Sequence, residues 1–258
     1  MQLVADVGNT EIVLGVLTDD ARTLGTHWRL STEVPRTADE FRHLLGSLLS
    51  DGTIQVDTIR QGVIGSVVPP VTRMLRSAME SLIPGQVLVI DANSPLPIRL
   101  EVKEPETVGA DRIVNTLAAK ELYARDTITV DLGTATTFDC ITGDGAFLGG
   151  VIAPGVEAGL DWLGRRTAKL PRVELSPPEK VIGQRTESCI RSGVFYSAVD
   201  AIDGMVRRIK DEWGRPDAFV VATGGYAAVL APHCTSIDSV EPFLTLHGLG
   251  LAGLHMAK

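Results

Sequence analysis

Apolar and polar positions near the start of the chain alternate in a way that predicts strands followed by a helix. Residues 2–8 and 11–18 are apolar and β-branched on either side of a tight turn at 8–10, and a further run covers 22–31. Apolar runs separated by a glycine turn are typical of antiparallel strands, so we expect three in succession. Residues 37–40 (TADE) have the capping-box pattern, and apolar positions at helical spacing follow them, which predicts a helix.

The chain then continues with two buried strands and a helix between them. Residues 59–67 and 86–91 are apolar runs, and the proline pair at 69–70 suits the first turn of a helix. The expected order of this part is therefore β-β-β-α-β-α-β. The segment 93–108 is rich in Pro, Glu and Ser and has no periodicity, so we place a domain boundary after residue 108.

The rest of the chain repeats the beginning. A helical pattern at 111–124 comes first. Predicted strands follow at 127–132, 137–142, 146–152 and 218–223. In both repeats an apolar strand ends in an aspartate, an apolar residue and a glycine: Asp6 in the first and Asp131 in the second. Because the two copies lie about half a chain apart, we expect two similar halves, each with a carboxylate beside a glycine turn.

Composition excludes several classes of protein. The 258 residues carry a net charge of −8, which argues against a broad nucleic-acid surface. The three cysteines form no CxxC pair, so neither a zinc ribbon nor a disulfide scaffold is expected. The N-terminus has no basic segment, and no apolar run approaches the length of a membrane span. We therefore expect a cytoplasmic protein with no nucleic-acid partner and no membrane partner.

The glycine turns indicate where phosphate could bind. A turn without side chains exposes backbone N–H groups that can hold phosphate oxygens, and a carboxylate beside it requires a divalent cation between the two. Asp6 next to residues 8–10 therefore indicates a magnesium–nucleotide loop, although the same pattern alone also fits a simple hairpin. The second copy of the pattern at Asp131 and the Thr-Gly-Gly at 223–225 favour a nucleotide-binding loop over a simple hairpin. Together they resemble the phosphate-1, phosphate-2 and adenosine motifs of the acetate kinase/sugar kinase/heat-shock/actin superfamily.

Other motifs are weaker or absent. Residues 248–253 match G-x-G-x-x-G but leave no room for a βαβ unit, so we interpret them as a small-residue packing face of a final helix. There is no P-loop, and the five histidines show no ligand spacing. Asp111 opens a helix and could be only a cap. Its neighbour Arg112 could hold a carboxylate with its planar fork.

At this point the resemblance becomes specific. The chain is similar to type III pantothenate kinases from residue 3 to about 250, with the blocks GADR at 109–112 and DLGTATT at 131–137 as the most discriminating. The further matching blocks are DVGNT at 6–10, WRLST at 28–32, SVVP at 66–69, GGVIAPG at 149–155, KLP at 169–171 and IG at 182–183 with Thr186 and Ser192-Gly193.

The resemblance implies a fold and a reaction. The fold is α/β, with duplicated actin-like (ribonuclease H-like) ATPase domains, each a mixed sheet flanked by helices, around a central cleft. Domain 1–108 would carry the phosphate-1 loop. Domain 109–258 would carry the substrate motif, the phosphate-2 loop and dimerisation helices. The reaction is the ATP-dependent phosphorylation of pantothenate to 4'-phosphopantothenate, the first step of coenzyme A biosynthesis, in a homodimer that uses Mg²⁺ and a monovalent cation, K⁺ or NH₄⁺.

The family's site residues carry over by position. The implied ATP-binding residues are Asp6, Val7, Gly8, Asn9, Thr10, Glu11, Ile12, Val13 and Thr134. The implied substrate-binding residues are Gly109, Ala110, Asp111, Arg112 and Thr186, the last from the partner subunit. Asp111 would be the catalytic proton acceptor, and Arg112 would bind the substrate carboxylate. Asp131 would ligate K⁺, and Asp6 would ligate Mg²⁺.

The chain departs from the family pattern at three places, and two other functions remain open. Glu11 stands where the family usually has Asn, Val102 where it often has Tyr, and Arg185 where it often has a smaller polar residue. One alternative is another small-molecule kinase or phosphatase of the same superfamily, which substrate screening would separate. The other is a non-enzymatic regulator. The active-site residues that the chain retains argue against a lost active site, and the net charge of −8 argues against contact with DNA; these residues are Asp6, Asp111, Arg112 and Asp131.

Overall fold

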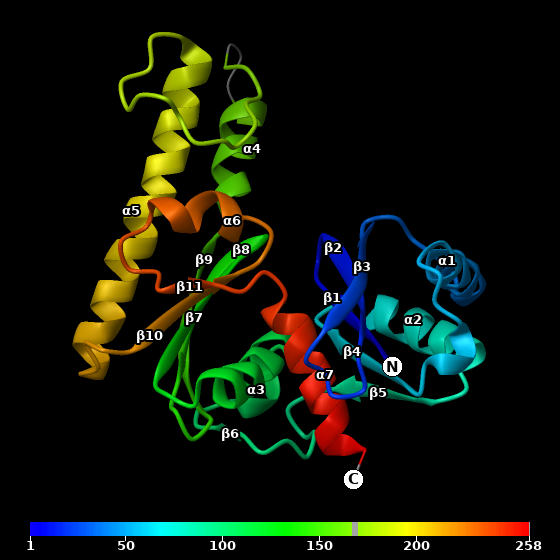
Figure 1. Ribbon diagram of the computed structural model, residues 1–258. Coiled ribbons are helices and arrows are strands. Elements are labelled where there is room, and N and C mark those ends of the chain that lie inside the picture. Colours follow the sequence, from blue (N-terminus) through cyan, green and yellow to red (C-terminus); the bar gives the residue numbers. More distant parts are fainter. Residues whose placement is uncertain (167–169, 258) are drawn as a thin grey trace. The chain divides into compact units, whose positions relative to one another are not determined.

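The structure is a computed structural model that describes residues 1–166 and 170–257, and its strands form two mixed sheets flanked by helices (Figure 1). The chain divides into two compact units. The first comprises Met1–Tyr123, Asp144–Phe147 and the segment from Leu244 onward, and the second comprises Ala124–Gly143 and Leu148–Phe243. Within the described ranges, no helix is long and apolar enough to cross a membrane.

The first sheet has the strand order β3-β2-β1-β4-β5. Its strands are β1 (Gln2–Val7), β2 (Glu11–Leu17), β3 (Leu24–Ser31), β4 (Gln61–Ser66) and β5 (Gln86–Ile90). One face packs against α1 (Ala38–Asp51) and α2 (Pro69–Leu82) through side chains such as Leu3, Phe41 and Met79. The capping box predicted for α1 is present, because Thr37 and Glu40 bond each other's backbone N–H. Buried apolar side chains therefore fix which face of this sheet the two helices cover.

The opposite face of the first sheet carries α3 (Ala110–Tyr123) and α7 (Leu244–Met256). Two close contacts bring α7 onto the strands: Cβ atoms placed on Gly15 and Gly65 would lie 2.9 Å from methyl groups of Leu246 and Leu249 respectively. Near the C-terminal end of α7, the side-chain amide of Gln61 donates a hydrogen bond to the carbonyl oxygen of Gly253 at 3.2 Å. The interpretation of residues 248–253 as a packing face of a final helix is thereby confirmed.

The second sheet has the strand order β11-β10-β7-β8-β9-β6. Its strands are β6 (Arg99–Leu100), β7 (Thr127–Leu132), β8 (Ala135–Ile141), β9 (Ala146–Pro154), β10 (Phe219–Thr223) and β11 (Ser239–Val240). The helices that follow these strands are α4 (Val156–Arg166), α5 (Thr186–Trp213) and α6 (Ala227–Leu230). Short 3₁₀ turns complete the described chain at Val56–Thr58, Pro105–Thr107 and Ala231–His233. In the second core, β7 and β10 pack their apolar face against α5 through residues such as Val130 and Val199.

Five strands of each sheet follow the same plan, which confirms the internal repeat. The order β3-β2-β1-β4-β5 corresponds to β9-β8-β7-β10-β11, and β6 is an addition at one edge. In both sheets the first strand forms an antiparallel hairpin with the second and pairs in parallel with the fourth. Asp6 and Asp131 each occupy the fifth position of the first strand, and the two strands have the same pattern of buried and half-buried positions.

The compact units do not coincide with the predicted domains 1–108 and 109–258. The reason is that α3 and α7 pack against each other and against strands of the first sheet, so both helices belong to the first unit. A boundary at residue 108 separates the two copies of the duplicated strand order, but it does not separate the two compact units. The predicted domain boundary stays a prediction. The element order expected for the first part of the chain is confirmed, whereas the bounds of α4 and α5 were not predicted.

A carboxylate on α5 holds a loop of the second unit in place. Asp203 accepts hydrogen bonds from the backbone N–H groups and the hydroxyls of Thr235 and Ser236, at distances from 2.7 to 3.0 Å. Partial burial raises the pKa of Asp203, but the hydrogen bonds from Ser236 and Thr235 outweigh it, so the pKa lies below its usual value. The ionised form of Asp203 therefore stabilises the fold.

We expect Asp203→Asn to lower the free energy of unfolding by about 1–3 kcal/mol at pH 7, because two of the four donors lose their acceptor. Since the folded pKa lies below the unfolded value of about 3.9, the difference from wild type should be complete above about pH 5 and shrink as the pH falls below about 4. Urea denaturation of both proteins at several pH values measures this difference in the free energy of unfolding. Asp200→Asn, an exposed change on the same helix, is the control; an equal loss there would contradict the assignment.

Candidate active site

The loop between β1 and β2 is held in one shape by the end of β3. The backbone N–H of Gly8 donates to the carbonyl oxygen of Glu11 at 2.9 Å and closes the turn. Thr32, directly after β3, donates from its hydroxyl to the carbonyl oxygen of Gly8 at 2.8 Å and from its N–H to that of Thr10 at 2.9 Å. A loop fixed by three hydrogen bonds is preorganised, as a phosphate-binding turn requires. Sequence reasoning missed the part played by Thr32, although it lies in the WRLST block.

The GADR block lies at the first turn of α3. The Asp111 carboxylate accepts a hydrogen bond from the backbone N–H of Arg112 at 2.9 Å. A Cβ on Gly109 would lie 2.4 Å from that same carboxylate oxygen, so a larger residue before Asp111 would require the carboxylate to move. Asp111 is thus held at a helix start, and this geometry suits both alternatives, a cap and a proton acceptor.

The structure brings the GADR block next to the β1–β2 loop. In the first sheet, Asp6 pairs with Gly65 of the neighbouring strand β4. A Cβ on Gly65 would lie 3.7 Å from the Cβ of Ala110, and a Cβ on Gly109 would lie 3.2 Å from a methyl group of Val67. The start of α3 therefore sits over the carboxyl end of β4, one strand away from Asp6. The predicted phosphate loop and the predicted substrate motif are neighbours within the first unit.

Arg112 is oriented by an aromatic ring. Its guanidinium lies over the ring of the buried Phe147, 4.9 Å from the ring centre. A guanidinium over a ring face is attracted by the ring electrons, which helps to hold it in place. An arginine held in this way is suited to bidentate recognition of a carboxylate. Phe147 had no role in the sequence-based interpretation.

A second loop in the second unit resembles the first. The N–H of Gly133 donates to the carbonyl oxygen of Ala135 at 3.1 Å and closes the β7–β8 turn, at which Thr134 lies. The turn after β10 reaches the same place: Gly224 has a φ of 90°, and a Cβ on it would lie 2.4 Å from a carboxylate oxygen of Asp131. Only glycine allows this approach. Asp131 and the predicted adenosine motif at 223–225 therefore meet within the second unit.

The remaining predicted residues fall into two groups. Val7, Asn9, Ile12 and Val13 lie on the β1–β2 hairpin with Asp6. Thr186 is the exposed first residue of α5, and that end of the helix lies well away from the second sheet (Figure 1). One chain therefore does not bring Thr186 to the Asp131 loop, and its contact with pantothenate across a dimer stays a prediction. Lys169, in the KLP block, lies outside the described residues.

Two further features bear on where a ligand could bind. Asn115, one helical turn after Asp111, is 1% exposed, and its side-chain oxygen has no hydrogen-bond partner among the described residues. It is therefore a buried acceptor without a partner, one of the few such groups that folded proteins contain, and it lies one turn along α3 from Asp111. Among those same residues, no group of three or more His, Cys, Asp and Glu side chains could enclose a metal ion.

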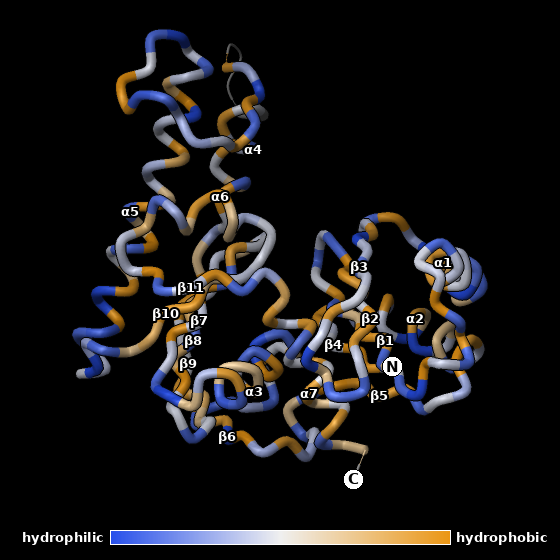
Figure 2. Tube along the Cα trace, in the orientation of Figure 1, coloured by the Kyte–Doolittle hydropathy of each residue, from blue (hydrophilic) through white to orange (hydrophobic). Residues whose placement is uncertain are grey.

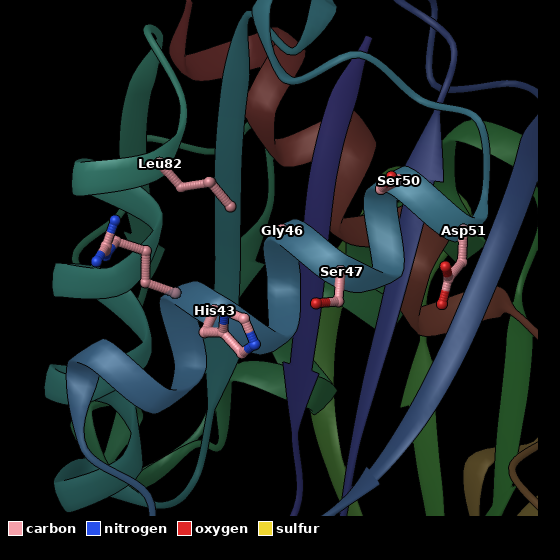
Figure 3. A pocket seen from close by; sticks show the side chains of 7 residues that line it. His43, Gly46, Ser47, Ser50, Asp51 and Leu82 are labelled. Atoms are coloured by element: carbon pink, nitrogen blue, oxygen red, sulfur yellow. The ribbon is translucent and has the colours of Figure 1, made fainter.

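A surface depression elsewhere on the first unit does not belong to this site. Figure 3 shows it along α1, with Leu82 of α2 at one side. Its lining residues are Arg42, His43, Gly46, Ser47, Ser50, Asp51 and Leu82. Because α1 and α2 cover the face of the first sheet opposite to α3 and α7, the depression is separated from Asp111 by the sheet.

Comparison with known proteins identifies the family. The family model of type III pantothenate kinases matches residues 2–208. The chain belongs to the type III pantothenate kinase family. A relative from Moorella thermoacetica, named type III pantothenate kinase, is 43% identical over 251 residues, which cover 96% of this chain and 97% of that one. A second, from Exiguobacterium sibiricum and with the same name, is 42% identical over 249 residues, with 96% and 97% covered.

Solved structures show the fold class. A ROK family glucokinase from Streptomyces griseus is 14% identical, with 98% of each chain covered and a TM-score of 0.50. A protein from Campylobacter jejuni, assigned to the Baf family of transcriptional activators, is 18% identical, with 97% and 96% covered and a TM-score of 0.59. At these identities the likeness concerns the fold alone. The predicted fold class, actin-like and sugar-kinase-like α/β, is confirmed.

Membership of the family also confirms the predicted reaction. The chain is a kinase that phosphorylates pantothenate at the expense of ATP, the first step of coenzyme A biosynthesis. The general alternatives, another kinase of the superfamily or a regulator without enzymatic activity, are therefore not retained.

Proposed function

We propose that the first unit performs the phosphoryl transfer, with Asp111 as the proton acceptor and Arg112 as the carboxylate clamp for pantothenate. The observation that supports this proposal is the contact of Ala110 with Gly65, the strand partner of Asp6. It puts the start of α3 beside the loop that would hold the nucleotide phosphates. Phosphoryl transfer depends mainly on positioning and on neutralising charge, and adjacent sites for donor and acceptor meet the first need.

Asp111 has the position for a proton acceptor in this reaction. The nucleophile is a hydroxyl of pantothenate, whose pKa is far above 7, so a base is needed only as the new P–O bond forms. The N–H of Arg112 holds the Asp111 carboxylate at the helix start. Arg112, stacked on Phe147, would hold the other end of the substrate by its carboxylate. The two neighbouring residues thereby fix both the orientation of pantothenate and the place of its proton.

Cations would complete the charge balance. Asp6 and Asp131 are hard oxygen ligands at the ends of the two first strands, which suits Mg²⁺ shared with phosphate oxygens and a monovalent cation, K⁺ or NH₄⁺, respectively. Mg²⁺ commonly binds through one or two carboxylates and substrate phosphates, which agrees with a single carboxylate in each loop. When bound, the cations would lower the repulsion between phosphate and carboxylate. Because ATP is the donor, we keep the cytoplasm as the predicted location.

The test is an assay of ATP-dependent phosphorylation with pantothenate, acetate and a set of sugars as acceptors, each with and without K⁺. We expect turnover of pantothenate only, and a strong increase with K⁺. Turnover of a sugar in place of pantothenate would overturn the proposal, whereas pantothenate turnover that is independent of K⁺ and NH₄⁺ would overturn the cation part alone.

We also propose that the chain forms a homodimer through the region around α4 and the start of α5. Large apolar side chains are exposed there: Trp162 on α4 is 62% exposed, and Val181 and Ile182 before α5 are 66% and 83% exposed. Orange segments in Figure 2 mark apolar residues in this same region. Exposed apolar groups of this size are typical of surfaces that bind another protein. A second copy would also supply the predicted contact from Thr186.

Ile182→Asp is expected to weaken the dimer by at least tenfold, because it places a charge in an apolar interface. Light scattering coupled to size-exclusion chromatography over a range of concentrations measures the dissociation. If Thr186 acts across the interface, the KM for pantothenate should rise with the monomer fraction. Val34→Asp, at an exposed apolar residue of the first unit, is the control. A wild-type chain that is monomeric at micromolar concentration would contradict the proposal.

A further inference from the structure

Arg29 lies in the row of residues that runs across the first sheet at the level of Asp6. Gly65 of β4 pairs with Asp6 of β1, Asp6 pairs with Val13 of β2, and Val13 pairs with Arg29 of β3. Neighbouring strands are about 4.8 Å apart, so the Arg29 backbone is about 10 Å from that of Asp6.

Arg29 also points to the same side of the sheet as Asp6. Side chains that pair across strands share a face, and successive residues alternate between faces. Trp28 and Leu30 pack into the core under α1 and α2, so Arg29 between them faces the other way. That is the face on which α3 and α7 lie. The guanidinium of Arg29 is therefore on the side of the sheet that carries the start of α3 and the GADR block.

A carboxylate at the exit of the β1–β2 loop holds this arginine. Glu11 is the first residue of β2, and its carboxylate accepts a hydrogen bond from the Arg29 guanidinium at 2.6 Å. The two side chains are 51% and 43% exposed. An ion pair this exposed contributes little to stability, so an anion that binds the loop more favourably can replace the Glu11 carboxylate. Phosphate presents oxygens to the planar arginine fork in much the same way as a carboxylate does.

We propose that Arg29 is a phosphate-binding residue of the nucleotide site and that Glu11 holds its guanidinium beside the loop until the phosphates of ATP take the place of the Glu11 carboxylate. This rests on the proposed ATP site at residues 6–13. It also accounts for the acidic Glu11 in a phosphate loop, because the negative charge is balanced by Arg29 before nucleotide binds. Nearby, Arg36 is engaged elsewhere: it donates to the carbonyl oxygens of Ser31 and Val34 and lies over Phe41.

The test compares the affinity of the full-length protein for a non-hydrolysable ATP analogue with Mg²⁺, measured by calorimetry, in wild type, Arg29→Gln and Arg29→Lys. We expect Arg29→Gln to weaken binding by about 10- to 100-fold, the range for a hydrogen bond to a charged group. Arg29→Lys should bind the analogue more tightly than Arg29→Gln but less tightly than wild type, because lysine keeps the positive charge and lacks the planar fork. The KM for pantothenate should change little, since Arg29 acts on the nucleotide.

A matched ion pair provides the control. Arg76 and Glu80 on α2 form an exposed pair at 2.8 Å on the opposite face of the sheet, so Arg76→Gln should leave nucleotide affinity unchanged. Glu11→Gln should tighten binding several-fold, because it removes the anion that competes for Arg29. Melting curves of each variant report folding separately.

The outcomes are distinguishable. Wild-type affinity in a folded Arg29→Gln protein would overturn the inference and leave Glu11–Arg29 as a cross-strand surface pair, while the proposed ATP site would stand. A wild-type protein that does not bind the analogue would overturn the ATP site at 6–13, and the role of Arg29 with it. If Arg29→Gln does not fold, Glu11→Gln decides, since unchanged affinity there also contradicts the exchange.

Discussion

Asp111→Asn is expected to lower kcat by about 10²- to 10⁴-fold while ATP binding stays close to that of wild type. Removal of a general base typically has an effect of this size. Asparagine keeps an oxygen that can accept the N–H of Arg112, so the start of α3 should keep its shape. It cannot accept the proton that leaves the hydroxyl of pantothenate. The loss should therefore appear in the chemical step rather than in nucleotide binding.

Steady-state kinetics and calorimetry with ATP measure the two effects separately. Glu106→Gln is the matched control, because Glu106 is an exposed carboxylate just before the GADR block. It should leave kcat unchanged. If Asp111→Asn retains more than about a third of the wild-type kcat, Asp111 is only a helix cap and the assignment as proton acceptor is wrong.

Asp131→Asn should raise the K⁺ concentration for half-maximal activity by more than about tenfold and lower activity even at saturating K⁺. The Asp131 carboxylate lies against the backbone of Gly224, at the strand ends where the second loop and the predicted adenosine motif meet. A carboxylate facing nucleotide phosphates is repulsive unless a cation lies between them. Asparagine keeps an oxygen ligand but lacks the charge, so it should hold K⁺ more weakly.

A K⁺ titration at fixed ATP, Mg²⁺ and pantothenate compares the variant with wild type, and a melting curve accompanies it. Asp211→Asn, an exposed change near the end of α5, controls for net charge. Should Asp131→Asn melt at a lower temperature yet keep the wild-type K⁺ response, then Asp131 only stabilises its own turn. The contact with Gly224 would explain that result.

The duplicated strands and their loops could be predicted from the sequence because their signals are local. An apolar run that ends in Asp-x-Gly indicates both where a strand ends and where the turn follows. The two strands that carry this pattern, β1 and β7, have the same sequence of buried and half-buried positions. The position of the GADR block beside the phosphate loop could not be predicted in this way. It depends on the contact of Ala110 with Gly65, and no local pattern links two residues so far apart in the chain.

The long helix α5 carries a sequence signal in its buried residues. Its buried residues recur at helical spacing, from Ile190 to Ile209, but Gly193 and Gly204 lower the helix propensity of the segment. The roles of Arg29 and Phe147 needed the structure for another reason. Each depends on which strands pair and in what register, and register is set by packing across the whole sheet.

The packing of α7 has a consequence for the order in which the protein can fold on the ribosome. Domains usually fold from the N-terminal end as they are synthesised. Here the first unit, with the β1–β2 loop, lacks the helix that packs on Gly15 and Gly65 until residues 244–256 have emerged. The second unit has all its strands before then. The first unit is therefore begun first and completed last. A ribosome that stalls after residue 243 would leave this N-terminal unit without α7, although all the strands of the second unit would already have been made.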